Sequence, residues 1–111
     1  MEVLDFLKEN ISLTPELVFK EIKTRDDFSD YSKSEGPYYM QPEGKIYTVY
    51  MYDFYFKNGD CISYTVKEFA FDTEIRKDGE WSYFSSQDDV WYVYKNNEFV
   101  LSETNKGEIK N

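Results

Sequence analysis

Histidine is absent from this chain. Histidine is the commonest general base and metal-binding side chain in proteins, so its absence excludes catalytic pairs of serine or cysteine with histidine. The chain has one cysteine, Cys61, which leaves no intrachain disulfide and too few ligands for a zinc site. We therefore expect a protein that is not an enzyme, uses no cofactor and binds no metal.

Nucleotide-binding loops and targeting segments are also missing. Neither the glycine-rich fingerprint of dinucleotide-binding proteins nor a P-loop occurs. The first residues include Glu2, Asp5 and Glu9 in place of the basic start of a signal peptide, and no apolar run approaches the ~20 residues of a membrane helix. The bias toward Lys, Asn, Ile, Tyr and Phe indicates an AT-rich genome. We expect a cytoplasmic protein of a bacterial host cell, with no membrane contact.

Positive charge is scarce in the sequence. Lysine and arginine total 13 against 22 aspartates and glutamates, which gives a formal net charge of −9. Binding to nucleic acid or to anionic membranes draws on lysine and arginine, so we expect neither as a direct partner. The same charge favours a basic protein as the partner. A second interpretation stays open, in which the charge only keeps the chain in solution.

Two amphipathic segments open the chain. A first short helix is indicated by apolar residues at helical spacing, namely Val3, Leu4, Leu7 and Ile11. Thr14 is a good N-cap and Pro15 suits the first position of a second helix. Residues 17–23 also alternate in polarity, which leaves a strand open for that segment. We expect residues 1–36 to be helical and residues 35–44 to form a connecting loop.

The hydrophobic period changes to two from Ile46 onward, which indicates strands. The dipeptide Asn58-Gly59 fits a type I′ hairpin turn and would place Phe56 opposite Cys61. A turn of this kind sets the register of the whole hairpin, because a slip of one residue moves every side chain to the other face.

Two further dipeptides predict hairpins, Asp-Gly at 78–79 and Asn-Asn at 96–97. The predicted class is therefore α+β, with one to three short N-terminal helices packed on an antiparallel β-meander of five to six strands. We expect a single domain over residues 1–111, in which the sheet covers residues 46–103 and residues 104–111 form a frayed tail.

The predicted register separates the side chains of the first hairpin into two faces. One face mixes aliphatic and aromatic side chains and would pack on the helices: Tyr47, Val49, Met51, Asp53, Tyr55, Ile62, Tyr64, Val66, Glu68 and Ala70. The other sets a row of rings, including Tyr50, Tyr52 and Phe54, opposite small polar residues. Which aromatic face is exposed stays open. Asp53 and Glu68 on one face leave a carboxylate-only enzyme or a ligand carrier as an alternative.

Acidic and aromatic side chains are the candidate contacts to a partner. They are Asp26, Asp27, Asp30, Tyr31, Glu35, Tyr38, Tyr39, Asp72, Glu74, Asp88 and Asp89, the first acidic ones at a helix end and the last ones in loops. Carboxylates can stand where phosphates would lie, and rings can stand where bases would stack. The sequence therefore predicts a non-enzymatic inhibitor that blocks a basic nucleic-acid-binding surface of a host protein by charge mimicry.

In length and composition the chain is similar to phage-encoded anti-defence proteins, anti-CRISPR proteins among them, although no shared motif carries the likeness. The resemblance implies a phage or mobile-element protein. Two alternatives stay open: an immunity or antitoxin-like protein that plugs a toxin, and an assembly subunit that oligomerises through its aromatic sheet face, for example as a homodimer.

Overall fold

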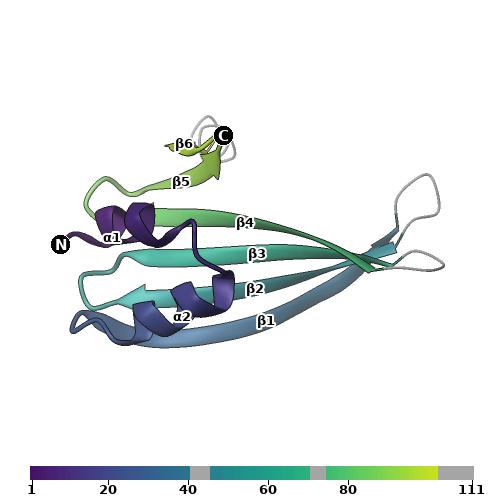
Figure 1. The fold of residues 1–111 in the computed structure, drawn as a ribbon, viewed down its shortest axis with the longest axis horizontal. Coiled ribbons are helices and arrows are strands. Elements are labelled where there is room, and N and C mark those ends of the chain that lie inside the picture. The colour runs from purple at the N-terminus through teal and green to yellow at the C-terminus, as the bar shows by residue number, and fades with distance from the viewer. Residues whose placement is uncertain (41–45, 71–74, 103–111) are drawn as a thin grey trace.

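The computed structural model describes residues 1–40, 46–70 and 75–102. Two helices precede a sheet of six strands (Figure 1): α1 (Val3–Asn10), α2 (Pro15–Lys23), β1 (Phe28–Met40), β2 (Ile46–Phe56), β3 (Cys61–Ala70), β4 (Ile75–Ser85), β5 (Val90–Lys95) and β6 (Glu98–Leu101). The strands lie in the sheet in chain order, and each pairs antiparallel with the next. The expected α+β class with an antiparallel meander is therefore confirmed.

Helix α2 begins where the capping signal predicts. The Leu17 N–H donates a hydrogen bond to the Thr14 Oγ1 at 3.4 Å, and Pro15 takes the first helical position. Lysines in the last turn lie at the negative end of the helix dipole. Residues 17–23 are therefore helical, and the strand left open by their alternating polarity does not form.

Residues 28–36 belong to strand β1, so the expected helical segment 1–36 is wrong beyond α2. Serine and aspartate recur in this stretch, and both are weak helix formers because their side chains compete for backbone hydrogen bonds. Pairing with β2 gives the backbone of β1 its hydrogen-bond partners instead. Pairing between two segments that are distant in sequence thus overrides the local preference for a helix.

The expected loop 35–44 is also partly wrong, because its first residues continue β1 as far as Met40. The register of β1 against β2 shifts between Glu35 and Tyr38. Pro37 lies inside this irregularity, where its missing N–H costs no ladder hydrogen bond. The strand therefore passes the proline without ending.

The β2–β3 hairpin differs from the expected type I′ turn. The Phe56 N–H bonds to the Asp60 carbonyl at 2.9 Å, and the Gly59 N–H bonds back to the Phe56 carbonyl at 3.0 Å. Gly59 has a φ of +97°, whereas Asn58 keeps a negative φ. The loop is a type I turn closed by a glycine bulge, which is one residue longer than a type I′ loop. Cys61 consequently pairs with the residue before Phe56, and the expected register is wrong by one residue.

This one-residue difference exchanges the faces of β2 relative to β3. Tyr52 and Phe54 lie under the helices, and the ring centroid of Phe19 in α2 is 5.0 Å from each of theirs. Ile62 and Tyr64 of β3 share this side, which we call the covered face. The core is formed by Val3, Leu7, Val18, Ile22, Phe54, Phe56, Ile62, Trp81 and Tyr83.

The opposite side of the sheet carries neither of the two helices (Figure 1), and we call it the open face. Met51, Asp53 and Tyr55 lie there, so the expectation that these residues pack on the helices is wrong. The register places the following side chains on the open face: Asp30, Ser32, Ser34, Met51, Asp53, Tyr55, Cys61, Ser63, Thr65, Glu80, Ser82, Phe84, Trp91 and Val93.

Asp78 and Gly79 form no turn, so the hairpin expected at this dipeptide is wrong. Both residues lie inside β4, which pairs with β3 from Ile75 to Phe84 without a register shift. The ring of Tyr64 lies across Gly79, and a Cβ at this position would overlap the Tyr64 hydroxyl. The glycine makes room for a neighbouring ring and does not reverse the chain.

The hairpin expected at Asn96 and Asn97 is confirmed. The two residues have φ values of +53° and +66°, which asparagine tolerates better than most residues. Tyr94 pairs with Phe99 as predicted. This turn therefore has both the length and the register that its sequence indicates.

Replacing Gly59 with valine is expected to lower the free energy of unfolding by about 2 kcal/mol, because a β-branched residue is strained at positive φ. A Cβ at Gly59 would also lie 3.1 Å from the Ser86 Cβ. Gly36→Ala is the matched control, since its Cβ would meet Val49 at an ordinary 3.4 Å. Urea denaturation measures both variants, and equal stability of the two would contradict the glycine bulge.

Candidate functional site

Three turns meet at one end of the sheet, on the left in Figure 1. The Lys57 N–H donates to the Asp27 carbonyl at 2.8 Å, which joins the α2–β1 turn to the β2–β3 loop. The Ser86 hydroxyl lies 2.9 Å from the Asn58 carbonyl and shares its one proton between that oxygen and the Asp60 carboxylate, which adds the β4–β5 turn. We call this region the turn end. It brings together five residues of the predicted acidic set: Asp26 and Asp27 from the turn before β1, Asp30 from β1, and Asp88 and Asp89 from the β4–β5 turn. From the sequence, the first three were expected at a helix end.

Asp27 is paired with Arg25 at the turn end. The guanidinium donates from Nε and Nη2 to the two carboxylate oxygens of Asp27, at 2.8 and 2.7 Å. These hydrogen bonds raise the pKa of Arg25 and lower the pKa of Asp27. Arg25 also donates to the Met1 carbonyl at 2.8 Å and lies over the ring of Phe6. We therefore assign Asp27 a structural role, in which it holds the chain start against the turn.

Exposed carboxylates remain at the turn end on Asp26, Asp30, Asp88 and Asp89. Asp30 accepts a hydrogen bond from the Tyr31 N–H at 2.8 Å, and the Asp88 N–H donates to the Ser85 hydroxyl at 3.2 Å. Within the described part of the chain, none of these carboxylates forms an ion pair. Their negative potential is therefore open to solvent and to a partner.

The other predicted contacts do not join this group. Tyr31 packs on the covered face, with the Lys23 Nζ 4.1 Å from its ring centroid and the Phe54 ring 5.0 Å away. Glu35 is exposed farther along β1, opposite Tyr50. The side chains of Tyr38 and Tyr39, and the whole of Asp72 and Glu74, lie outside the described residues.

The open face has a hollow that sequence reasoning missed. It has a volume of about 410 Å³ and is lined by Met51, Asp53, Tyr55, Gly59, Cys61, Ser63, Phe84 and Trp91. Its middle lies over β3, where the side chains are small, and its sides are the larger residues of β2, β4 and β5. The alternation of small residues in β3 was visible in the sequence, but the register that sets rings on either side was not.

Asp53 is the acidic group of this hollow. The Ser63 hydroxyl donates a hydrogen bond to its Oδ1 at 2.5 Å. Among the residues that the structure describes, no lysine or arginine pairs with Asp53. Beside it, burial raises the pKa of the Cys61 thiol to about 11, so the sulfur stays protonated and unreactive at neutral pH.

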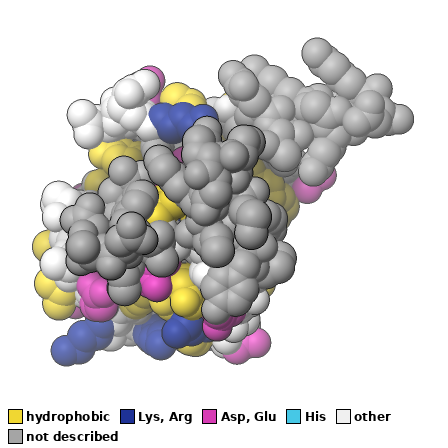
Figure 2. Space-filling view, turned by 90° about the vertical axis from the view of Figure 1, so that its right-hand side faces the viewer, with side chains coloured by type: hydrophobic (Ala, Val, Ile, Leu, Met, Phe, Trp, Pro, Cys, Tyr) yellow, Lys and Arg dark blue, Asp and Glu magenta, His cyan; other side chains and the backbone are white. Residues whose placement is uncertain are grey.

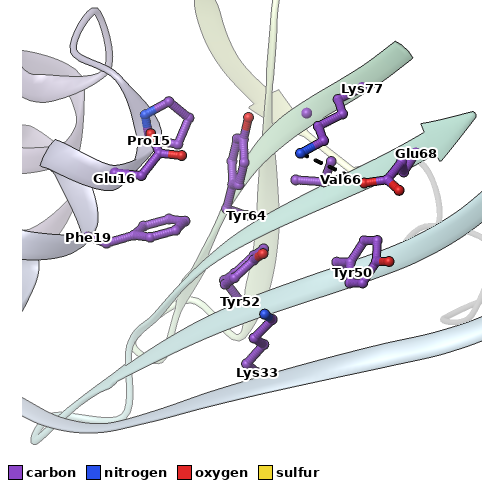
Figure 3. Close-up of a pocket in the computed structure, with 11 residues that line it drawn as sticks. Pro15, Glu16, Phe19, Lys33, Tyr50, Tyr52, Tyr64, Val66, Glu68 and Lys77 are labelled. Carbon is purple, nitrogen blue, oxygen red and sulfur yellow. Dashed lines mark ion pairs between the residues drawn. The ribbon is translucent and has the colours of Figure 1, made fainter. Parts of the chain in front are cut away.

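A groove of about 420 Å³ lies on the covered face beside α2 (Figure 3). Tyr50, Tyr52 and Tyr64 give it rings and hydroxyl groups. Its charges are mixed: the Lys77 Nζ lies 3.7 Å from a Glu68 carboxylate oxygen, and Lys33 and Glu16 also line the groove. This balance selects neither an anion nor a cation.

The carboxylate pair that left an enzyme open does not form, because Asp53 and Glu68 lie on opposite faces. Asp53 lines the hollow of the open face, whereas Glu68 lines the groove of the covered face. A general acid and a general base must both reach one substrate. The two carboxylates cannot act together in that way.

Figure 2 looks at the end of the sheet opposite the turn end. In the lower half of this view, lysine or arginine side chains lie beside aspartate or glutamate side chains. The electrostatic potentials of neighbouring opposite charges largely offset each other at longer range, and salt screens what remains. Exposed carboxylates without an ion pair among the described residues lie at the turn end and also on the two helices, for example Asp5, Glu9 and Glu21.

A buried carboxylate supports the turn end from inside. Asp60 is only 4% exposed, and it accepts hydrogen bonds from the Tyr83 hydroxyl at 2.5 Å and from the Ser86 N–H and hydroxyl at 2.9 and 2.8 Å. Burial opposes its ionisation, but these hydrogen bonds outweigh burial and lower the pKa of Asp60. Burial and the bond to Asp60 raise the pKa of Tyr83. The ionised carboxylate thus links the β2–β3 loop, β4 and the β4–β5 turn.

Asp60→Asn is expected to destabilise the fold at pH 7 by about 2 kcal/mol, because the amide cannot accept all of these hydrogen bonds. The lowered pKa means that the carboxylate stabilises the fold above the unfolded-state value of about 3.9 and loses this contribution as the pH falls further. Urea denaturation between pH 7 and pH 3 should show the gap between wild type and variant closing below about pH 4. A gap that stays constant to pH 3 would contradict the ionised state.

The described residues include no group of three or more acidic or cysteine side chains arranged to hold a metal ion, and no helix among them has the length and apolar character to cross a membrane. Comparison with known proteins finds no matching family model, curated protein or solved structure.

Proposed function

We propose that this chain is a non-enzymatic protein-binding inhibitor that covers a basic, nucleic-acid-binding surface of a host protein with its open face and turn end. One observation carries the proposal. The open face has no described helix over it and exposes large apolar side chains, Met51 at 39% and Tyr55 at 41%, beside carboxylates that no described cation neutralises. Interface cores are enriched in methionine, tyrosine and tryptophan, with polar residues around them.

Charge complementarity determines the kind of partner. Asp30 and Asp53 lie on the open face, and Asp26 and Asp89 extend the acidic region onto the turn end. A surface that binds nucleic acid offers lysine and arginine for phosphates and rings for bases. The carboxylates occupy the places of phosphates in this proposal, and the exposed rings occupy the places of bases. Nucleic acid itself is repelled by a chain of net charge −9.

The similarity in length and composition to phage-encoded anti-defence proteins supports a phage or mobile-element origin and action in the bacterial cytoplasm. An immunity or antitoxin-like protein would use the same surface against a basic toxin, and the identity of the partner separates the two functions. Self-association through the ring row of β2 is disfavoured, because Tyr52 and Phe54 already pack under α2.

A capture experiment from nuclease-treated bacterial lysate tests the proposal. The immobilised chain should retain a basic protein that is released as salt rises above about 0.15 M, where screening shortens to ~8 Å. The retained protein should bind nucleic acid when purified alone. Retention of nothing but further copies of this chain would favour the assembly subunit and contradict the inhibitor.

A further inference from the structure

We infer that the hollow of the open face receives an arginine side chain of the partner. This inference rests on the proposed function and identifies the partner side chain that binds at the centre of the interface. The hollow is lined by the rings of Tyr55, Phe84 and Trp91 and by the carboxylate of Asp53. It combines apolar walls with one carboxylate. Such a site favours a positively charged side chain whose remaining atoms are apolar or form a planar group.

The shape of the hollow follows from the register. Tyr55, Cys61, Phe84 and Trp91 pair in one row across β2, β3, β4 and β5. Cys61 lies between Tyr55 and Phe84 in this row and is only 6% exposed, so its small side chain forms the floor of the hollow and the two rings flank it. Trp91 packs against Phe84 with ring centroids 5.3 Å apart, which fixes the far wall. A planar guanidinium can lie over this floor with its face against the rings.

Asp53 supplies the charge that an arginine needs. Ser63 holds one of its oxygens through a hydrogen bond of 2.5 Å, which orients the carboxylate, and no described residue donates a hydrogen bond to the other oxygen. No described lysine or arginine pairs with Asp53. A partner that covered the hollow with apolar groups alone would strip water from this carboxylate without replacing its hydrogen bonds, which is costly. A cationic side chain avoids that cost.

Arginine fits this site better than lysine. The guanidinium is planar, donates several hydrogen bonds in a fixed geometry, stacks on aromatic rings and is more weakly hydrated than an ammonium group. Tyr55 and Trp91 offer the rings, and Asp53 offers the acceptor. Arginine is also the residue that recurs in surfaces that bind phosphate, which agrees with the proposed partner.

Titration with the peptide Ac-Gly-Arg-Gly-NH2 tests the inference without the partner. The chain has two tryptophans. In heteronuclear NMR spectra, the indole N–H of Trp91 should shift on titration, whereas that of Trp81 should not, because Trp81 is buried on the covered face. The citrulline peptide, which has the same shape without the charge, should bind at least about tenfold more weakly.

Two variants complete the test. Asp53→Asn and Tyr55→Ala should each weaken binding of the arginine peptide, the first by about tenfold through loss of charge-assisted hydrogen bonds. Asp5→Asn is the matched control, since it removes the same charge from an exposed position on α1. Equal effects of Asp5→Asn and Asp53→Asn, equal binding of arginine and citrulline peptides, or a silent Trp91 would overturn the inference. If the chain still captured a basic partner in a salt-dependent way after such a result, the proposed function would stand and only the arginine site would be wrong. Failure of the inference can therefore be distinguished from failure of the proposed function.

Discussion

Phe54→Ala is expected to lower the free energy of unfolding by about 4 kcal/mol, the cost of emptying a well-packed aromatic site. Phe54 is completely buried, and its ring contacts Phe19 of α2 and Tyr31 of β1, both at centroid distances of 5.0 Å. Because the side chain lies between the sheet and the helices, its removal leaves a cavity that neither layer can fill by a small shift. Urea or thermal denaturation monitored by circular dichroism measures the loss.

The neighbouring substitution Tyr55→Ala is the control for this prediction. Tyr55 is 41% exposed and lies on the open face, so its loss should cost less than about 1 kcal/mol. The two residues are adjacent in sequence and both carry an aromatic ring, but they lie on opposite faces of the sheet. The opposite order of effects would show that the helices cover the other face and that the assigned register is wrong.

The triple variant Asp26→Lys, Asp30→Lys, Asp89→Lys is expected to weaken binding to the captured partner by about a hundredfold, which is ~2.7 kcal/mol. These carboxylates are exposed and form no ion pairs among the described residues, so reversing them replaces attraction by repulsion. Most of the change should appear as slower association that depends on salt. Surface plasmon resonance at two salt concentrations measures it.

A second triple variant controls for net charge. Asp5→Lys, Glu9→Lys and Glu21→Lys change the formal charge by the same amount at exposed positions on α1 and α2. Binding of this variant should be nearly unchanged. Because Asp89 has a φ of +56°, lysine at this position should lower the melting temperature of the first triple variant slightly, and both variants should remain folded at the assay temperature. If the two variants weaken binding equally, overall charge and not the turn end attracts the partner.

The N-terminal helices and the last hairpin could be predicted from the sequence because their signals are local. Thr14 and Pro15 mark the start of α2 within one turn, and the Asn-Asn pair at 96–97 allows one tight loop. The dipeptide at 58–59 was ambiguous, since Asn-Gly suits both a type I′ turn and the longer loop with a glycine bulge. One residue of difference then reversed the face assigned to the whole of β2.

Strand β1 and the continuous strand β4 were missed for another reason. Residues 28–40 have little strand character of their own, and their conformation depends on pairing with β2. The sequence around Gly79 predicts a turn, but the glycine instead leaves space for the ring of Tyr64, which belongs to a different strand. Contacts between segments far apart in sequence leave no local pattern by which they could be recognised.

The acidic composition of the candidate site was visible in the sequence, and its arrangement was not. The sequence named Asp26, Asp30, Asp88 and Asp89, but it could not show that Arg25 pairs with Asp27. The hollow required the register of four strands, because each of its walls comes from a different one. Such a site becomes visible only when the strands are placed side by side.

The proposed inhibition is tested most directly by competition with nucleic acid on the captured partner. A fluorescent oligonucleotide bound to the partner reports its release as a fall in anisotropy when this protein is added. The account predicts complete release by the wild type, weaker release by the Asp26, Asp30, Asp89 triple variant, and no species that contains the partner, the oligonucleotide and this chain together. A stable complex of all three, with the anisotropy unchanged, would contradict it.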